Sequence, residues 1–277
     1  MSTASPRPPA DAPADAGCCD GGGDPHDHSG HDHPPTGAEV VGALVRGFSV
    51  LSLAIPVLAL GLLIGILLLT PSTPLVLGLG ALLGVLQLGT VVLSGLAVSR
   101  TRSALAVHPG LLVARVGLDE ALRLAVVLLA LVLFAAEPRT PLGLWIGAGC
   151  ALVWLALATA QMISARSRIA QPSAWSQDLV SGLLSQKVGI PRTMAMRLLD
   201  VIGTAAFQIG ATILVITAPI MVLATIVLGI ASGLSTLVLQ RRMPAERTRS
   251  MWAFAPIAVG VLTVLLAILS ASTAPGL

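Results

Sequence analysis

The chain has 277 residues, of which 55% are hydrophobic and 10% are charged, and its formal net charge is +3. Soluble domains carry about 25% charged residues, so this composition excludes an ordinary soluble domain and predicts long segments in lipid. The charges are unevenly distributed. Residues 1–45 hold seven acidic residues and one arginine, a net charge of −6, whereas residues 46–277 hold fifteen basic and six acidic residues, a net charge of +9. We therefore expect an acidic tail followed by a basic membrane domain.

The tail, residues 1–45, is rich in Pro, Ala, Asp and Gly and has no apolar stretch before Val40. Such a segment cannot bury enough apolar surface to offset the entropy lost on folding, so we expect it to be disordered. It also lacks the basic and apolar regions of a signal peptide.

The tail also contains a candidate metal site, formed by four histidines in the sequence HDHSGHDH and two adjacent cysteines: His26, His28, His31, His33, Cys18 and Cys19. Neutral imidazole binds Zn, Ni, Co and Cu(II), and neighbouring carboxylates strengthen the local negative field. The alternative is a tail of biased composition that has no metal-binding role.

A helix that crosses a bilayer needs about 20 apolar residues, and seven segments of residues 46–277 come close to this requirement. We predict spans near residues 49–70, 75–98, 121–136, 142–163, 201–217, 220–239 and 251–271. The fifth and sixth belong to an uncharged segment that would reach about 58 Å as one helix, so we expect the chain to turn at Ala218–Pro219. The predicted fold class is all-α: a polytopic helical membrane protein of about seven transmembrane helices with a disordered N-terminal tail.

Basic residues alternate between the predicted connections. The connections 99–120, 164–200 and 240–250 carry three, five and four basic residues, whereas 71–74, 137–141 and 218–219 carry one between them. Basic connections face the cytoplasm. We therefore expect a multi-pass protein of the cell membrane, with its N-terminus in the cytoplasm and its C-terminus outside.

Four GxxxG motifs occur in the predicted spans: Gly61–Gly65, Gly80–Gly84, Gly143–Gly147 and Gly229–Gly233. Small residues at this spacing allow two helix backbones to approach closely. We interpret the motifs as contacts within the bundle. The alternative is an interface with a second copy of the chain or with a membrane partner subunit.

Ionisable residues inside a membrane are costly and therefore indicate function. The predicted spans contain almost none, because Arg123 and Asp200 fall at predicted helix ends, where lipid headgroups solvate them. The polar residues at depth are neutral, and we consider six of them candidates for a polar path: Gln87, Thr90, Gln208, Thr212, Ser232 and Ser235. Hydrogen bonds between helices are the alternative role for these side chains.

No predicted span contains a histidine, and the sequence has no phosphate-binding or dinucleotide-binding loop. We therefore expect neither an enzyme nor a nucleic-acid-binding protein. Two function classes remain. One is a transporter or permease component for a small solute or divalent metal ion, with the tail capturing or sensing metal. The other is a non-catalytic subunit or scaffold that binds a protein partner. Polar residues that converge on one cavity favour the first class, and a lipid-facing seam of small residues without a cavity favours the second.

The metal hypothesis predicts that the four tail histidines act together. Each must be neutral to bind a metal ion, so affinity falls as the pH drops through about 6.5, the ordinary histidine pKa. We expect a peptide of residues 1–45 to bind Zn²⁺ or Ni²⁺ with micromolar affinity in isothermal titration calorimetry. Replacing His26, His28, His31 and His33 with alanine should abolish this binding and alter the metal tolerance of cells. Stoichiometric binding by the fourfold variant would contradict the histidine site.

Overall fold

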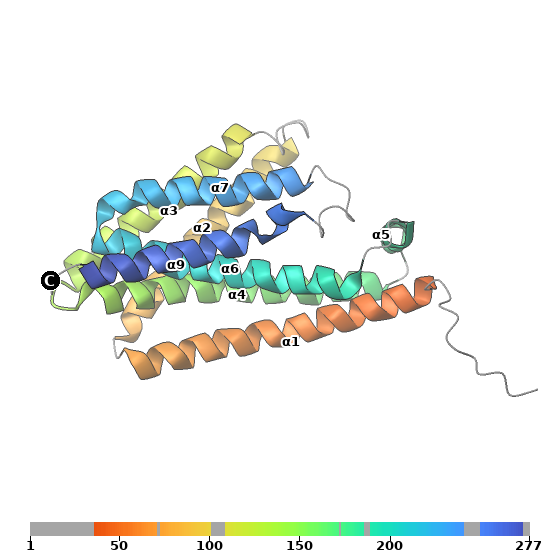
Figure 1. Ribbon diagram of the computed structural model, residues 1–277, viewed down its shortest axis with the longest axis horizontal. Coiled ribbons are helices and arrows are strands. Elements are labelled where there is room, and N and C mark those ends of the chain that lie inside the picture. The colour runs from red at the N-terminus through yellow and green to blue at the C-terminus, as the bar shows by residue number, and fades with distance from the viewer. Residues whose placement is uncertain are drawn as a thin grey trace, which may run out of the picture. The chain divides into compact units, whose positions relative to one another are not determined.

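The computed structural model describes residues 36–70, 73–100, 109–171, 173–185, 189–240 and 250–273, and every regular element within them is helical (Figure 1). The long helices are α1 (Gly37–Leu69), α2 (Pro74–Arg100), α3 (Pro109–Leu133), α4 (Arg139–Ala170), α6 (Ile190–Thr217), α7 (Val222–Gln240) and α9 (Ala255–Thr273). The shorter elements are α5 (Ala174–Ser185) and two 3-10 turns, η2 (Pro219–Met221) and η3 (Met251–Phe254). The predicted all-α fold is confirmed.

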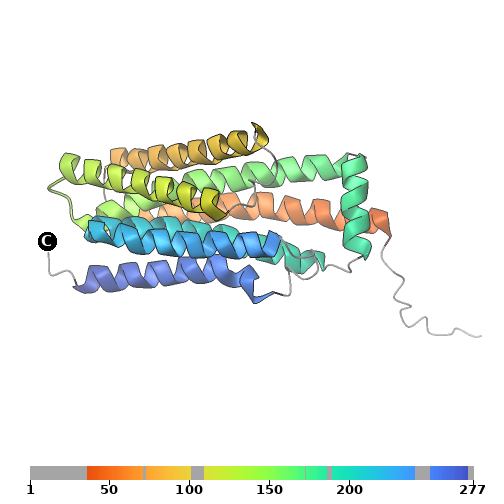
Figure 2. The same cartoon turned by 90° about the horizontal axis from the view of Figure 1, so that it is seen from above.

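Among the described residues, six helical segments are long and apolar enough to cross a membrane: Gly37–Leu68, Pro74–Leu96, Arg139–Ala170, Ile190–Thr217, Pro219–Leu239 and Met251–Thr273. Helix α3 has 25 residues and runs lengthwise among the others (Figure 2), but Asp119, Glu120 and Arg123 distinguish it from these six apolar segments. The described chain starts at one end of the bundle, and α9 finishes at the opposite end (Figures 1 and 2). The chain is therefore a polytopic helical membrane protein.

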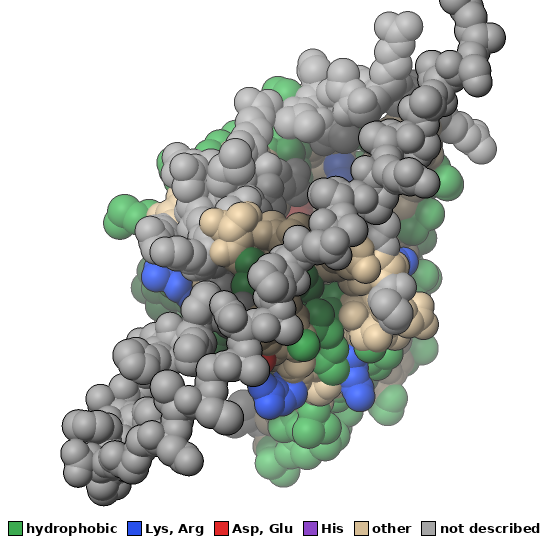
Figure 3. Space-filling model, turned by 90° about the vertical axis from the view of Figure 1, so that its right-hand side faces the viewer, with side chains coloured by type: hydrophobic (Ala, Val, Ile, Leu, Met, Phe, Trp, Pro, Cys, Tyr) green, Lys and Arg blue, Asp and Glu red, His purple; other side chains and the backbone are tan. Residues whose placement is uncertain are grey.

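Helices α4 and α6 form the centre of the bundle. Helix α4 packs against α1, α2 and α6, while α6 also packs against α9, and α3 packs against α2 and α7. Helix α5 lies across the long helices at the end where α1 starts, and it contacts α1 (Figures 1 and 2). Figure 3 looks onto this end of the bundle and shows several basic side chains there.

The helix boundaries follow local sequence signals. At the start of α1, the Thr36 hydroxyl accepts a hydrogen bond from the Glu39 N–H, and the Glu39 carboxylate accepts one from the Thr36 N–H, which together form a capping box. Residues 37–45 are therefore helical, although the sequence predicts them as part of the tail; residues 1–35 lie outside the described residues. Helix α6 ends at Thr217 and a new turn starts at Pro219, so the predicted break is confirmed.

Two helices start earlier than the sequence predicts. Helix α3 begins at Pro109, within the segment expected to be a polar connection, and α6 begins at Ile190 rather than near residue 201. Consequently Arg123 and Asp200 do not lie at helix ends: both are interior to their helices, and Arg123 is buried. The prediction was wrong because the hydropathy of a segment contains no information on its contacts with other helices. Neighbouring helices can pair with a charged side chain and so allow it to lie inside a helix.

Three of the four GxxxG motifs lie at contacts between helices, so the internal-packing interpretation is confirmed for them. A Cβ on Gly80 of α2 would overlap the backbone carbonyl of Ile146 on α4. Gly143–Gly147 of α4 approaches the backbone of α6, and Gly229–Gly233 of α7 meets side chains of α3. The fourth motif differs, because nothing lies within 4 Å of a Cβ on either glycine of Gly61–Gly65 in α1.

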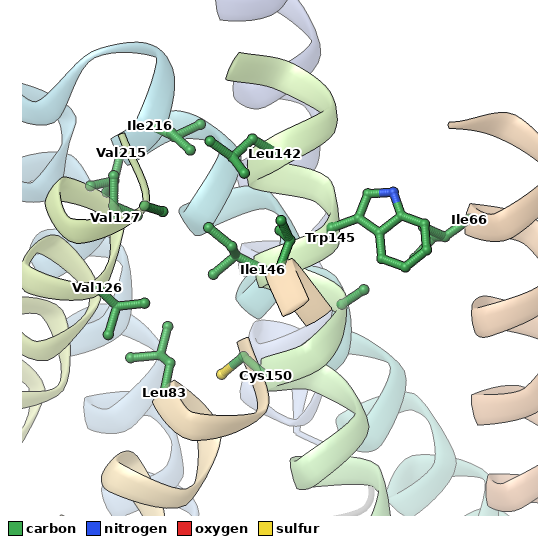
Figure 4. Close-up of a cluster of buried hydrophobic side chains, with 13 residues drawn as sticks. Ile66, Leu83, Val126, Val127, Leu142, Trp145, Ile146, Cys150, Val215 and Ile216 are labelled. Atoms are coloured by element: carbon green, nitrogen blue, oxygen red, sulfur yellow. The ribbon is translucent and has the colours of Figure 1, made fainter. Parts of the chain in front are cut away.

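An apolar cluster holds the helices together on one side of the bundle centre (Figure 4). It includes Leu83 of α2, Val127 of α3, Ile146 of α4 and Ile216 of α6, all of them buried. Cys150 lies at the edge of this cluster, and its thiol bonds to polar side chains. The apolar cluster therefore borders a polar region inside the bundle.

The glycine contacts predict a difference between two identical substitutions. Gly80→Ala places a methyl group against the rigid backbone of Ile146, so we expect a loss of about 1–3 kcal/mol in the free energy of unfolding. The matched control, Gly61→Ala, adds the same methyl group in open space and should be neutral or stabilising by up to ~1 kcal/mol. Unfolding of both variants in detergent micelles measures the difference, and equal effects would contradict the close α2–α4 contact.

Candidate functional site

Arg123 lies deep inside the bundle, in the interior of α3. Its exposed fraction is 0%, and ten residues separate it from the end of α3 at Leu133, a helical distance of about 15 Å. This distance is half the thickness of a bilayer's hydrocarbon core, which is about 30 Å. A guanidinium at such depth is costly unless other groups pair with it.

All five N–H groups of Arg123 donate hydrogen bonds to protein acceptors. Nε donates to Glu120 Oε2 at 3.0 Å and Nη2 donates to Glu120 Oε1 at 3.1 Å, which makes a bidentate ion pair. Nη2 also donates to Gln208 Oε1 at 2.6 Å. Nη1 donates to the Gln208 carbonyl at 3.1 Å and to Thr212 Oγ1 at 2.8 Å. The donor capacity of the guanidinium is therefore fully used.

Glu120 extends this network to a third helix. Thr225 of α7 donates its hydroxyl to Glu120 Oε2 at 2.6 Å, and the exposed fraction of Glu120 is 2%. The ring of Phe207 on α6 lies 5.6 Å from the Arg123 guanidinium carbon, within the range of a cation–π contact. The ion pair thus connects α3 to both α6 and α7, and its hydrogen bonds offset the cost of burying two charges.

A second polar group adjoins the ion pair. The Cys150 Sγ on α4 lies 3.4 Å from Gln87 Oε1 and 3.4 Å from Gln208 Oε1, so its single S–H can donate to either oxygen. Trp154 Nε1 donates to Gln87 Oε1 at 3.2 Å, and Gln87 Nε2 donates to the Asp119 carbonyl at 3.4 Å. Gln208 belongs to both groups, so hydrogen bonds join α2, α3, α4, α6 and α7 around one centre.

Asp119 forms a looser arrangement beside this centre. Its Oδ1 accepts a hydrogen bond from the Thr90 hydroxyl of α2. Its Oδ2 lies 3.7 Å from Arg115 Nε, one turn earlier on α3. That separation satisfies an ion pair but exceeds hydrogen-bond length, so this pair is held less firmly than Glu120 and Arg123.

A cavity of about 230 Å³ opens beside the polar centre. The charged side chains of its lining all come from α3, and they are Arg115, Asp119, Glu120 and Arg123. Uncharged polar side chains from the surrounding helices complete the polar part of the lining: Gln87, Trp154, Thr204, Gln208 and Ser232.

Two further cavities adjoin the first. One, of about 540 Å³, lies between α2, α3 and α7 and shares Arg115, Asp119 and Ser232 with it. The other, of about 160 Å³, lies between α4 and α6, is lined by Asp200, and shares Trp154. The three cavities therefore follow one another from α7 to α4 through shared lining residues.

The structure brings most of the predicted polar candidates to the first cavity or to the charged side chains that line it. Gln87, Gln208 and Ser232 line the first cavity. Thr90 bonds to Asp119, and Thr212 accepts from Arg123. Ser235 is buried on α7, where its hydroxyl donates to the Ser232 carbonyl at 2.6 Å.

The predicted metal ligands lie outside the described residues: His26, His28, His31, His33, Cys18 and Cys19. Within the described ranges, no group of three or more His, Cys, Asp or Glu side chains could hold a metal ion.

The charged residues of α3 are the functional candidates that the sequence prediction missed. Two signals could have found them, because Arg115 and Asp119 are spaced by four and Glu120 and Arg123 by three, the spacings of ion pairs on one helix face. The segment ARVGLDEALR can therefore neutralise its own charges as a helix. Its partners Gln208 and Thr225 lie 85 and 105 residues further along the chain and carry no local signal.

Comparison of the chain with models of protein families, with curated proteins and with solved structures finds no match. The class of the protein, a polytopic helical membrane protein with a buried ionic network, therefore rests on its own fold and site.

The two ion pairs of α3 predict unequal costs of removing an arginine. Arg123→Met leaves the Glu120 carboxylate buried without its guanidinium partner, so we expect the free energy of unfolding to fall by about 3–5 kcal/mol. Arg115→Met is the matched control on the same helix. Arg115 is one-third exposed and loosely paired, so its loss should cost about 1 kcal/mol or less. Equal costs for the two variants in detergent micelles would contradict the buried network.

Proposed function

We propose that the chain is a transporter or permease component of the cell membrane, and that the cavity beside Glu120 and Arg123 is its solute site. The observation that carries this proposal is the convergence of charged and polar side chains from five helices on one cavity inside the bundle. Charged residues inside a membrane protein are retained at a cost, and they commonly mark a solute or ion pathway.

The convergence of predicted polar residues on one cavity is the feature that distinguishes a transporter from a scaffold. Gln87 of α2, Gln208 of α6 and Ser232 of α7 line the same cavity although they come from three different helices. Side chains that served only to join helix pairs would not need an adjoining space. The convergence on a cavity therefore supports transport over a purely structural role.

The charge of the lining favours a small solute over a divalent metal ion in the cavity. Two guanidinium groups, Arg115 and Arg123, face this space and balance the carboxylates of Asp119 and Glu120. The lining therefore has no net negative charge to attract a doubly charged cation. In our proposal, any metal chemistry belongs to the tail, where His26, His28, His31 and His33 capture or sense the ion.

The proposed orientation places the α5 end of the bundle in the cytoplasm. The first turns of α1, the last turns of α4 and the first turns of α6 meet at this end (Figure 1), and they carry Arg46, Arg166, Arg168, Arg192 and Arg197. Basic residues are enriched on the cytoplasmic side of membrane proteins. The N-terminus would then be cytoplasmic, and α9 would end outside.

The alternative, a subunit that binds a membrane partner, has one observation in its favour. The Gly61–Gly65 motif of α1 has open space where Cβ atoms would lie, so it is free of the internal contacts that occupy the other three motifs. This face would suit another helix, and under this alternative the cavity would have no role.

Transport predicts that filling the cavity abolishes uptake. Cells that express the chain would be given a defined mixture of amino acids, amines, carboxylates, sugars and the ions Zn²⁺, Ni²⁺ and Co²⁺, with uptake measured by mass spectrometry. Ser232→Trp fills the cavity, so we expect a loss of at least tenfold in the uptake of the transported solute. Val227→Trp is the control, since Val227 lies on the same helix, does not line the cavity, and has an exposed fraction of 65%.

The control variant should transport as the unaltered chain does. If expression of the chain raises the uptake of no member of the mixture, or if Ser232→Trp retains full uptake, the proposed transport site is wrong and the partner-binding alternative is favoured.

A further inference from the structure

The four charged side chains of the central cavity differ in how many of their hydrogen-bonding atoms are already occupied by protein partners. Every N–H of Arg123 donates to a protein acceptor, and both oxygens of Glu120 accept from Arg123, one of them also from Thr225. A solute that bound either group would have to break part of this buried network, which leaves a charge unpaired in the bundle interior. Glu120 and Arg123 therefore position the site, and they are not its solute-binding charges.

Arg115 and Asp119 are the charges that a solute can reach. Both line the central cavity and also the larger cavity between α2, α3 and α7. Their side chains remain partly exposed, at 35% and 17%. Asp119 Oδ2 and Arg115 Nε are 3.7 Å apart, and a separation beyond hydrogen-bond length leaves each with unused bonding capacity toward the cavity.

Arg115 and Asp119 together carry no net charge, and this neutrality determines which charges a bound solute should have. A solute with one charge would pair with one of them and leave the other uncompensated in a region of low dielectric, which is unfavourable. A solute with both an ammonium and a carboxylate can satisfy both, with its ammonium on Asp119 and its carboxylate on Arg115. It replaces one ion pair by two and keeps the site neutral.

We propose that the cavity binds a small zwitterion of the α-amino-acid type, held between Asp119 and Arg115. This inference rests on the proposed function, since it names the solute class of the same site. The rest of the lining fits a hydrocarbon substituent, because Val116, Trp154, Phe207 and Val259 give the cavity apolar and aromatic walls. The other helices contribute only uncharged side chains to the central cavity, so they do not disturb the charge balance.

A matched set of three ligands tests the solute class on the purified full-length chain. L-leucine carries both charges, 3-methylbutylamine is the same skeleton without the carboxylate, and 4-methylpentanoate is the same skeleton without the ammonium. Isothermal titration calorimetry in detergent micelles should show L-leucine binding roughly 10- to 100-fold more tightly than either single-charge analogue, the difference expected for one charged hydrogen-bonding contact. Glycine and L-phenylalanine extend the test to smaller and larger zwitterions.

Two variants then test which side chain holds which group. Asp119→Asn leaves a net positive site and should bind 4-methylpentanoate more tightly than L-leucine. Arg115→Gln leaves a net negative site and should prefer 3-methylbutylamine. The control Arg139→Gln makes the same change at an exposed position of α4 away from the cavity lining, and it should keep the preference for L-leucine. A reversal of preference cannot arise from misfolding, which would remove binding of all three ligands.

The outcomes separate this inference from the proposed function. Binding of none of the three zwitterions, or tighter binding of a single-charge analogue by the unaltered chain, overturns the zwitterion site whether or not the variants fold. If the uptake mixture meanwhile shows transport of a sugar, an amine or a carboxylate, the proposed function stands and only the solute class is wrong. Binding of L-leucine without any uptake would retain the site and overturn transport.

Discussion

The guanidinium of Arg123 can be buried in this bundle only because five acceptors surround it, and the positions of three helices follow from that constraint. Two acceptors belong to Glu120 on the same helix, and three come from Gln208 and Thr212 on α6. The carboxylate in turn takes the Thr225 hydroxyl from α7. A rotation of α6 or α7 about its axis would withdraw one of these partners, so the network fixes how the helices face one another as well as how close they lie.

Helix α3 is the only one of the described helices to line the central cavity with charged side chains, and it neutralises them internally. Arg115 with Asp119 and Glu120 with Arg123 are both pairs within one or two turns. The surrounding helices then need to supply only dipoles: amide, hydroxyl, indole and thiol groups. This division of roles explains how a helix of ordinary spanning length can carry four charges within the bundle, since its charged segment has no net charge to transfer into a low-dielectric interior.

The sequence was sufficient for the fold class and for features that depend on neighbouring residues. Composition predicts the helical membrane class, and the Ala218–Pro219 break follows from the length of the uncharged segment. Gln87, Gln208 and Ser232 could be selected because polar residues are rare in apolar segments. The start of α3 could not, because Asp119, Glu120 and Arg123 lower the hydropathy that defines a span, and Thr212, which stabilises Arg123, lies 89 residues away. Burial of a charge depends on contacts between distant segments, which local hydropathy does not contain.

The glycine contacts give the bundle parts of unequal stiffness. Gly80 brings the backbone of α2 against α4, Gly147 brings α4 against α6, and Gly203 brings α6 against α9, in each case with backbone atoms facing the missing Cβ. Gly229 and Gly233 of α7 instead meet the ends of side chains on α3, Val116 and Leu112, which can change rotamer. Helices α2, α4, α6 and α9 therefore form an interlocked frame, whereas α3 and α7 meet at these two glycines through side chains. The cavity of about 540 Å³ lies between α2, α3 and α7, so it borders the contact at which side-chain rotamers, without movement of a backbone, can change the space available inside the bundle.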